Sequence, residues 1–256
     1  AEDGIRDLVR SRGLGDVYKR QHEYVGPEFD WPPYRELRED QQSVEHIRYL
    51  YASLLAFCDQ QLCRVLDAFD RYELWDDTML LVNTDHGFLM GEHDWWAKVI
   101  NPFFQEIAHI PFWAYDPRFP SEKGKRSNAL TQTIDLPATI LDYFDLSRPD
   151  NMQGRPIFGS RDDHNASREA ALFGVMGGHV NVTDGRYVYM RGNVTEDNSP
   201  LFEYTLMPAR MRGMFSPKEL SNWEKSAGFG FTKECKLMKI PSRVPKMFAS
   251  KDNPVG

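Results

Sequence analysis

The sequence contains no long apolar run and no excess of positive charge. No hydrophobic stretch reaches the roughly 18 residues that a membrane-spanning helix needs, so we expect no membrane span. Lys and Arg number 31 against 38 Asp and Glu, which gives a formal charge of −7. Because nucleic-acid-binding surfaces are basic, this balance argues against nucleic acid as a partner.

Cysteine is scarce. The chain has Cys58, Cys63 and Cys235, an odd number without the spacing of a metal site. Cys58 and Cys63 lie five residues apart within a helical pattern. We therefore expect buried free thiols rather than a disulfide or a metal centre.

The first 21 residues lack the apolar core of a signal peptide. Back-translated, the peptides AEDGIRD and SRGLGDVYKRQ within this stretch both resemble the DNA of sequencing adaptors. We therefore expect residues 1–21 to be adaptor-derived and the native chain to start near His22. They are left out of the fold prediction for that reason.

What is present is enough apolar material for a sizeable core, at 41% of 256 residues. Apolar positions recur at helical spacing from Gln41 to Tyr72, which predicts a long helix. Residues 78–84 and 110–115 are short apolar runs typical of strands, and 134–144 predicts a helix with Asp135 near its N-cap. This order predicts an α/β fold with a largely parallel sheet over residues 22–151.

The composition changes after about Asn151, and we expect 152–256 to form a smaller α+β subdomain. Its alternating and polar patterns predict a hairpin at 179–190 with a two-residue turn at Asp184-Gly185, a strand at 201–206 and a helix at 216–227 capped by Ser216.

The candidate chemistry begins where the strand at 78–84 ends. Asp85 and His86 place a carboxylate beside an imidazole, and both are good ligands for a divalent cation. In open α/β sheets such groups collect at the carboxyl ends of strands. We expect Gly87 to let the backbone turn sharply there. These three residues alone also fit a simple strand-end turn with a capping Asp and an exposed His.

The residues that follow make the pattern more specific. Residues 83–98 read NTDHGFLMGEHDWWAK, and EIAHIPF follows at 106–112. This motif resembles the sulfatase family of the alkaline phosphatase superfamily, and within it the iduronate-2-sulfatase-like branch. The helical pattern at 49–67, TQTIDLPATILDYF at 131–144 and the stretch 174–191 extend the resemblance over most of residues 24–225.

The resemblance implies a fold and a set of roles. The fold is the C-terminal part of an alkaline-phosphatase-like sandwich, a mostly parallel sheet with flanking helices. Asp85 and His86 match two ligands of a calcium ion, although the histidine also suits zinc or manganese. Lys98 matches a lysine that contacts sulfate oxygens. The implied substrate is a sulfated small molecule or carbohydrate.

Five nearby residues have less definite roles. Glu92 and His93 either order the loop around the cation site or form an exposed pair. His109 either packs at a strand start or lines a pocket. Trp96, with its neighbour Trp95, either lines the substrate cleft or lies in the core.

The family's nucleophile motif is missing. Sulfatases use a formylglycine made from Cys or Ser in C/S-x-P-x-R, and no Cys or Ser here has that context. The resemblance places the nucleophile and two early Asp ligands upstream. We therefore expect a C-terminal fragment that is inactive by itself.

Other functions fit part of this pattern. A phosphodiesterase or phosphonate monoester hydrolase of the same superfamily would share the motif. A non-catalytic binding protein on the same fold is a third reading, although retention of Asp85, His86 and Lys98 together argues against it. A zinc protein built on His86 and His93 lacks the H-E-x-x-H spacing.

Overall fold

The computed structural model describes residues 36–98, 103–158, 168–194, 199–210 and 213–242. The expected adaptor-derived segment lies outside them. The chain divides into two compact units, residues 1–99 with 105–127 and residues 100–104 with 128–256. The units are described separately.

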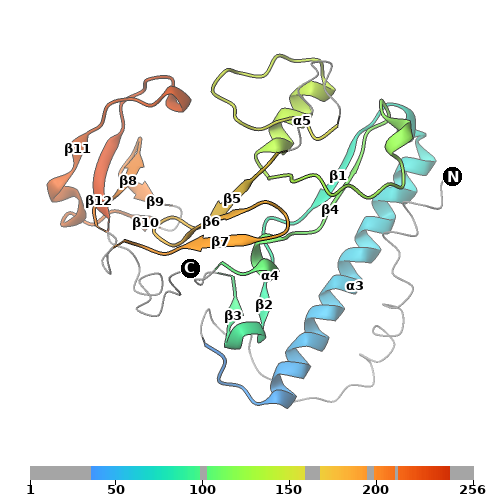
Figure 1. The fold of residues 1–256 in the computed structure, drawn as a ribbon, viewed down its shortest axis with the longest axis horizontal. Coiled ribbons are helices and arrows are strands. Elements are labelled where there is room, and N and C mark those ends of the chain that lie inside the picture. Colours follow the sequence, from blue (N-terminus) through green and yellow to red (C-terminus); the bar gives the residue numbers. More distant parts are fainter. Residues whose placement is uncertain (1–35, 99–102, 159–167, 195–198, 211–212, 243–256) are drawn as a thin grey trace. The chain divides into compact units, whose positions relative to one another are not determined.

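The first unit contains a helix of 31 residues, α3 (Gln41–Arg71), as the apolar spacing predicted (Figure 1). Asp40 caps its start, where the carboxylate accepts a hydrogen bond from the Ser43 N–H at 2.8 Å. Its buried side chains include Ile47 and Leu66, each 1% exposed. The three cysteines are free, but the expectation of buried thiols is wrong for Cys58 and Cys235, which are exposed, and Cys63 is only half-buried.

The strands β1 (Leu80–Asn83) and β4 (Phe112–Tyr115) pair with each other, and the pairing is antiparallel. The mixed α/β class is confirmed, but the predicted parallel arrangement is wrong for the described strands, all of whose pairs are antiparallel. The physical reason is local. The chain leaves β1, forms a hairpin and a short helix at the same end, and runs straight back beside it. Asn83 at the end of β1 therefore faces Phe112 at the start of β4.

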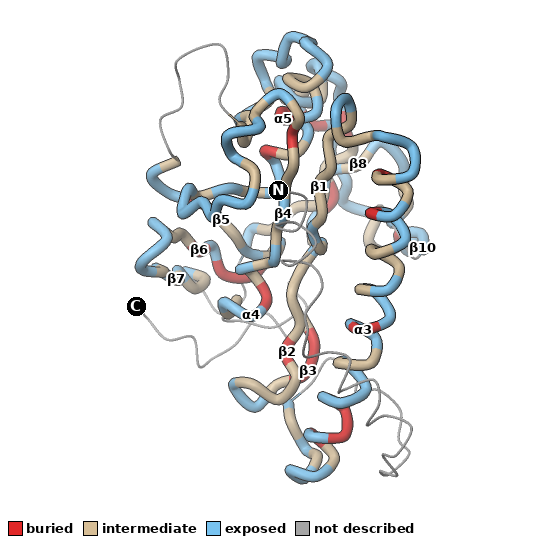
Figure 2. Tube along the Cα trace, turned by 90° about the vertical axis from the view of Figure 1, so that its right-hand side faces the viewer, coloured by how far each residue is buried: buried red, intermediate tan, exposed pale blue. Residues whose placement is uncertain are grey.

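The connection between β1 and β4 carries the candidate site. It comprises β2 (Leu89–Met90), the 3-10 turn η2 (Glu92–Asp94), β3 (Trp96–Ala97) and the single-turn helix α4 (Gln105–Ala108). The hairpin packs on α3 through a cluster of Val44, Ile47 and Trp96. Figure 2 shows the hairpin strands as a buried stretch of the tube. Two further 3-10 turns, η1 (Leu74–Asp76) and η3 (Pro120–Glu122), complete this unit.

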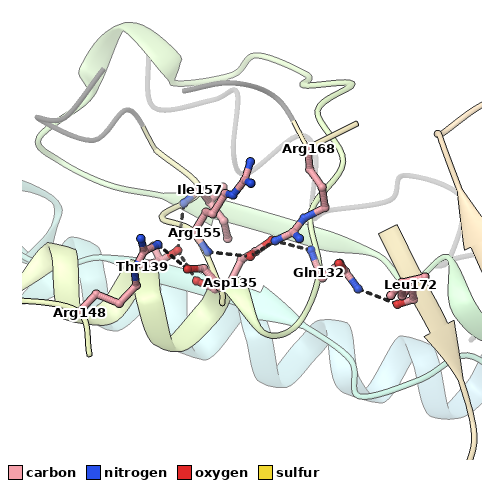
Figure 3. Close-up of polar contacts among 9 residues, drawn as sticks. Gln132, Asp135, Thr139, Arg148, Arg155, Ile157, Arg168 and Leu172 are labelled. Carbon is pink, nitrogen blue, oxygen red and sulfur yellow. Dashed lines mark hydrogen bonds and ion pairs between the residues drawn. The ribbon is translucent and has the colours of Figure 1, made fainter. Parts of the chain in front are cut away.

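In the second unit, α5 (Asp135–Tyr143) confirms the predicted helix. Asp135 is its first residue, and the buried carboxylate ties down the chain that follows the helix (Figure 3). It accepts backbone N–H groups of Gln132 at 2.8 Å and Arg155 at 2.9 Å, and it pairs with Arg168. These contacts group α5 with the later chain, so the units divide between 127 and 128, whereas the composition changes near Asn151.

Three strands form an antiparallel sheet, β5 (Ala171–Gly174), β6 (Val180–Thr183) and β7 (Val188–Arg191). The predicted hairpin at 179–190 is present, but its loop is wider than two residues. Thr183 pairs with Val188, so 184–187 form the loop. The Asp184 carboxylate accepts the N–H groups of Arg186 and Tyr187, which stabilises the wider turn.

The last part of the second unit contains a further sheet, of β8 (Leu201–Thr205), β12 (Met238–Ser242) and β11 (Glu224–Lys225), and the pair β9 (Ala209–Arg210) and β10 (Gly213–Met214). The predicted helix at 216–227 is wrong. Ser216 does begin a turn by bonding Glu219, but only the 3-10 turns η4 (Glu219–Asn222) and η5 (Gly230–Thr232) form, because 224–225 pair with β12. No helix of the described segments is long and apolar enough to cross a membrane.

Candidate functional site

Asp85 and His86 follow β1 directly, and local hydrogen bonds fix how they leave the strand. The Thr84 hydroxyl donates to the carbonyl of His86 at 3.1 Å, and the His86 N–H donates to Asp85 Oδ1 at 3.0 Å. The Asp85 side chain is 82% exposed, while that of His86 is 30% exposed. The strand end thus presents a carboxylate to solvent, with a half-buried imidazole beside it.

The imidazole of His86 is held in one orientation. Its Nδ1 lies 2.8 Å from the carbonyl oxygen of Gly87, so this nitrogen carries the proton and donates. The other ring nitrogen, Nε2, lies 3.3 Å from Asp85 Oδ2. Metal-binding histidines usually have one ring nitrogen fixed by a backbone carbonyl in this way, with the other directed at the metal.

Lys98, immediately after β3, completes the convergence. Its Nζ contacts His86 Nε2, twelve residues earlier in the chain. Burial acts to raise the pKa of the Asp85 carboxyl, but the neighbouring His86 charge, backbone N–H groups and the Lys98 ammonium together outweigh it, and the pKa falls below its ordinary value. The structure therefore brings Asp85, His86 and Lys98 to one point.

The donor set fits part of a divalent-cation site. Asp85 Oδ2 and His86 Nε2 are 3.3 Å apart, a separation that two ligands of the same ion can adopt. Within the described segments, no group of three or more His, Cys, Asp or Glu is placed to hold a metal. The pair thus offers two donor groups, and a complete cation site needs more.

Gly87 is glycine for a reason different from the one expected. Its φ lies outside the left-handed region, but a Cβ there would sit 1.7 Å from the carbonyl oxygen of Glu106 in α4. Its N–H also donates to the carbonyl of Ile107 at 2.8 Å. Close approach of two backbones, and not a sharp turn, excludes a side chain at this position.

Glu92 orders the hairpin turn. One carboxylate oxygen accepts the Met90 N–H at 2.5 Å, and the other lies 3.4 Å from the guanidinium of Arg48 on α3. Arg48 also donates to the Met90 carbonyl at 3.0 Å. The turn is thereby attached to α3 as well as closed on itself.

His93 and His109 both contact α4. His93 does so through its side chain, and His109 through its backbone at the end of the helix. His93 Nε2 lies 3.2 Å from both carboxylate oxygens of Glu106. His109 is exposed, and its backbone N–H donates to the Gln105 carbonyl at 2.8 Å, which closes α4. The contacts that join Asp85, His86 and Lys98 run directly between those three side chains.

Trp96 does not line a cleft. Its side chain is fully buried at 0% exposure, and its indole N–H donates to Glu39 at 2.7 Å. The ring packs with Val44 and Ile47 of α3. Its role is to seat the hairpin on the helix, so the cleft alternative for this residue is wrong. Trp95 is half-buried and pairs with Glu36 in an isolated bridge.

Two contributors were not singled out from the sequence. Glu106 lies inside the quoted stretch EIAHIPF, but nothing in its spacing shows that it faces His93. Arg48 lies on α3 and has no motif of its own. Both act through contacts between distant segments, which a one-dimensional pattern does not report.

Comparisons with known proteins agree on one family. The family model described as Sulfatase matches residues 17–146. The chain is 25% identical over 226 residues to an ulvan-active sulfatase of Formosa agariphila, which covers 82% of this chain and 42% of that protein. It is 28% identical over 130 residues to an arylsulfatase of Clostridium perfringens, 50% of this chain and 27% of the relative.

A shorter match reaches 37% identity over 71 residues of human iduronate 2-sulfatase, 28% of this chain and 12% of that protein. Among solved structures, a protein in complex with its substrate D-glucosamine-2-N,6-O-disulfate aligns with a TM-score of 0.50 at 19% identity, over 59% of this chain and 33% of that one. The chain thus spans less than half the length of each of these proteins. Since the family model covers half of the chain, the chain belongs to the sulfatase family of the alkaline phosphatase superfamily.

Proposed function

We propose that this chain carries part of the active site of a metal-dependent sulfatase, which hydrolyses sulfate esters. In this proposal Asp85 and His86 hold one divalent cation and Lys98 contacts the sulfate group. The observation that supports it is the convergence of the three side chains, with Lys98 Nζ and Asp85 Oδ2 both beside His86 Nε2. Family membership supplies the reaction class.

Each side chain contributes a defined property. The Asp85 carboxyl has a lowered pKa and is therefore ionised, as a cation ligand must be. His86 presents Nε2 because Nδ1 donates to the Gly87 carbonyl. Lys98 supplies positive charge that balances the charge on sulfate oxygens as the ester bond breaks. A bound cation supplies Lewis-acid polarisation of the ester.

Calcium is the proposed cation. A carboxylate ligand suits a hard ion, and the histidine also accepts zinc or manganese. The proposed substrate class is a sulfated carbohydrate. Support comes from the names of two relatives, an ulvan-active sulfatase and an N-acetylglucosamine-6-O-sulfatase, and from the sulfated glucosamine bound in the structurally similar protein.

The 256-residue chain by itself is proposed to be inactive. It contains no C/S-x-P-x-R sequence, the context in which the family's nucleophile is made. Metal-dependent turnover of 4-nitrocatechol sulfate by this purified chain would overturn this part of the proposal. The longer protein that carries an upstream nucleophile motif is expected to hydrolyse the same ester.

The test of the site uses that longer protein and 4-nitrocatechol sulfate. Chelation with EDTA should abolish turnover, and calcium, manganese and zinc are added back separately. Because Lys98 acts on charge that develops in the reaction, Lys98→Ala should lower kcat by roughly 10²–10³-fold. Asp85→Ala and His86→Ala should make activity dependent on much higher metal concentrations.

The matched control is Lys125→Ala, which removes another lysine of the same unit, paired on the surface with Glu122. It should leave kcat unchanged. Equal losses in Lys98→Ala and Lys125→Ala would contradict a specific role. Faster turnover of bis(4-nitrophenyl) phosphate than of the sulfate ester would favour a phosphodiesterase, and sulfate binding without turnover of either would favour a binding protein.

A further inference from the structure

The short helix α4 touches both halves of the candidate site. On one side, the Ile107 carbonyl accepts the Gly87 N–H at 2.8 Å, and the Glu106 carbonyl leaves no room for a Cβ on Gly87. On the other side, the Glu106 carboxylate lies 3.2 Å from His93 Nε2 through both of its oxygens. One turn of helix thus contacts Gly87, directly after Asp85 and His86, and the hairpin turn that ends at Lys98.

That hairpin turn has an unfavourable backbone. Gly91 has φ 95°, and three residues with a Cβ also lie in the left-handed region, His93 at 56°, Asp94 at 60° and Ala97 at 77°. Such conformations persist only where surrounding contacts hold them. Lys98 directly follows Ala97, so any relaxation of the turn moves the lysine.

Contacts at three points hold the turn, and they differ in what they connect. Arg48 with Glu92, and the buried Trp96, fasten the turn to α3. The contact between His93 and Glu106 fastens it to α4. Loss of Glu106 therefore leaves the hairpin attached to α3 and removes its side-chain link to α4.

We propose that α4 is a positioning element that holds the 91–98 turn in place relative to Asp85 and His86, with Glu106 as its positioning residue. The inference rests on the proposed function, which gives that placement its purpose. Glu106 acts through His93 and has no role as a ligand of the cation or of the sulfate. Placement matters because a displacement of about 1 Å in a site can cost roughly 100-fold in rate.

The experiment is a double-mutant cycle on the 256-residue chain, read by hydrogen–deuterium exchange of peptides that span 86–98. Glu106→Ala, His93→Ala and the double variant should each accelerate exchange at 91–98 by roughly two- to fivefold, the scale of an exposed ion pair. The double variant should match the singles, because all three remove the same contact. Glu106→Gln retains an oxygen that accepts from His93 and should restore slow exchange.

The control is Glu122→Ala, which removes an exposed ion pair with Lys125 in the same unit and should leave exchange at 91–98 unchanged. Additive effects in the cycle, or unchanged exchange in Glu106→Ala, would overturn the inference. If Glu106→Ala fails to fold, His93→Ala and Glu106→Gln still decide it, since the first should accelerate exchange and the second should not.

A second measurement separates this inference from the proposed function. Binding of inorganic sulfate in the presence of calcium is measured by calorimetry on the longer protein used in the site test, and Glu106→Ala should weaken it by roughly two- to fivefold, with recovery in Glu106→Gln. Absence of sulfate binding in that protein without substitutions would count against the proposed function, while the exchange cycle on the 256-residue chain still decides the role of α4. Sulfate binding with an additive exchange cycle would keep the function and reject the positioning role.

Discussion

Gly87 packs its Cα against the backbone of α4, where an added Cβ would lie 1.7 Å from the Glu106 carbonyl oxygen and 3.0 Å from the Ile107 Cα. Backbone atoms cannot rotate away as a side chain can. A methyl group at this position therefore has to push α4 and the end of β1 apart. The same residue follows His86, so the displacement reaches the candidate site.

Gly87→Ala is therefore expected to destabilise the chain by roughly 1–3 kcal/mol, the range for inserting a methyl group into a close contact. Urea unfolding of the purified chain measures the change. Gly230→Ala is the control, because nothing lies within 4 Å of a Cβ built there and its φ is not left-handed. Equal stability of both variants would mean that α4 yields easily.

At the residue scale, the sequence located Asp85, His86 and Lys98 because they are close together in a spaced motif. It did not predict Glu106 as a partner of His93, thirteen residues away, or Arg48 as a partner of Glu92, forty-four residues away. It also placed Asp135 near a helix N-cap, whereas the Asp135 carboxylate accepts the backbone N–H of Arg155 and pairs with the guanidinium of Arg168. Such partners depend on tertiary packing, which leaves no periodic signal.

At the scale of elements, the long periodic pattern was predictive, and so were the short apolar runs that form β1, β4 and β8, but the short pattern at 216–227 was not. The pattern from Gln41 gave α3 because an amphipathic stripe over many turns has few alternatives. The stretch 216–227 begins with a helix-capping serine, Ser216, yet it forms the 3-10 turn η4 and then the strand β11. Pairing of β11 with β12 decided that outcome. The direction of β1 relative to β4 was likewise set by the intervening hairpin.

Arg210 of β9 links two elements of the second unit through a pair of carboxylates. Its guanidinium lies 2.8 Å from Glu203 on β8 and 2.8 Å from Glu219 in η4, and it stacks 3.9 Å over the Phe215 ring. Hydrogen bonds from Ser216, and then Arg210, lower the pKa of Glu219 to about 2. The ionised carboxylate is thus favoured by the fold.

This lowered pKa predicts how the second unit responds to acid. A group whose pKa is depressed on folding stabilises the fold above its unfolded pKa, here near 4.5, and loses that contribution as the pH falls towards about 2. Glu219→Gln should therefore lower the midpoint temperature of unfolding at pH 6. It should also reduce the difference between the midpoint temperatures at pH 6 and pH 3. Thermal unfolding followed by circular dichroism between pH 2 and 7 measures this.

The control for this prediction is Glu224→Gln, which removes another exposed carboxylate of the same unit, paired with Lys239 at 3.3 Å. It should keep the steep loss of stability below pH 4. A Glu219→Gln profile parallel to that of the unmodified chain would show that the Arg210 cluster does not couple to folding.

At the scale of the whole molecule, the chain corresponds to only part of the relatives that it matches. The chain belongs to the sulfatase family but spans 42% of the ulvan-active relative and 27% of the arylsulfatase. The proposed site brings together Asp85, His86 and Lys98, and no further His, Cys, Asp or Glu joins them in a metal-binding group within the part of the chain that the structure describes. The proposed chemistry therefore needs groups in addition to these three.

The surface of α3 bears on how this chain behaves by itself. Leu50, Leu54 and Phe57 recur at i, i+4 and i+7 and are 38%, 54% and 58% exposed, so they form an apolar stripe along one face of the helix. A continuous apolar stripe in contact with water favours association between molecules. We therefore expect the chain to associate increasingly as its concentration rises, and Leu54→Glu with Phe57→Glu to reduce that association.

Sedimentation velocity over a range of chain concentrations measures the effect. Arg64→Glu is the control, because it changes the charge of an exposed position on the same helix without removing apolar surface. The double substitution should shift the distribution towards monomer, and Arg64→Glu should not, since burial of apolar area rather than net charge drives the contact. Equal shifts in both variants would mean that charge repulsion, and not loss of the stripe, separates the molecules.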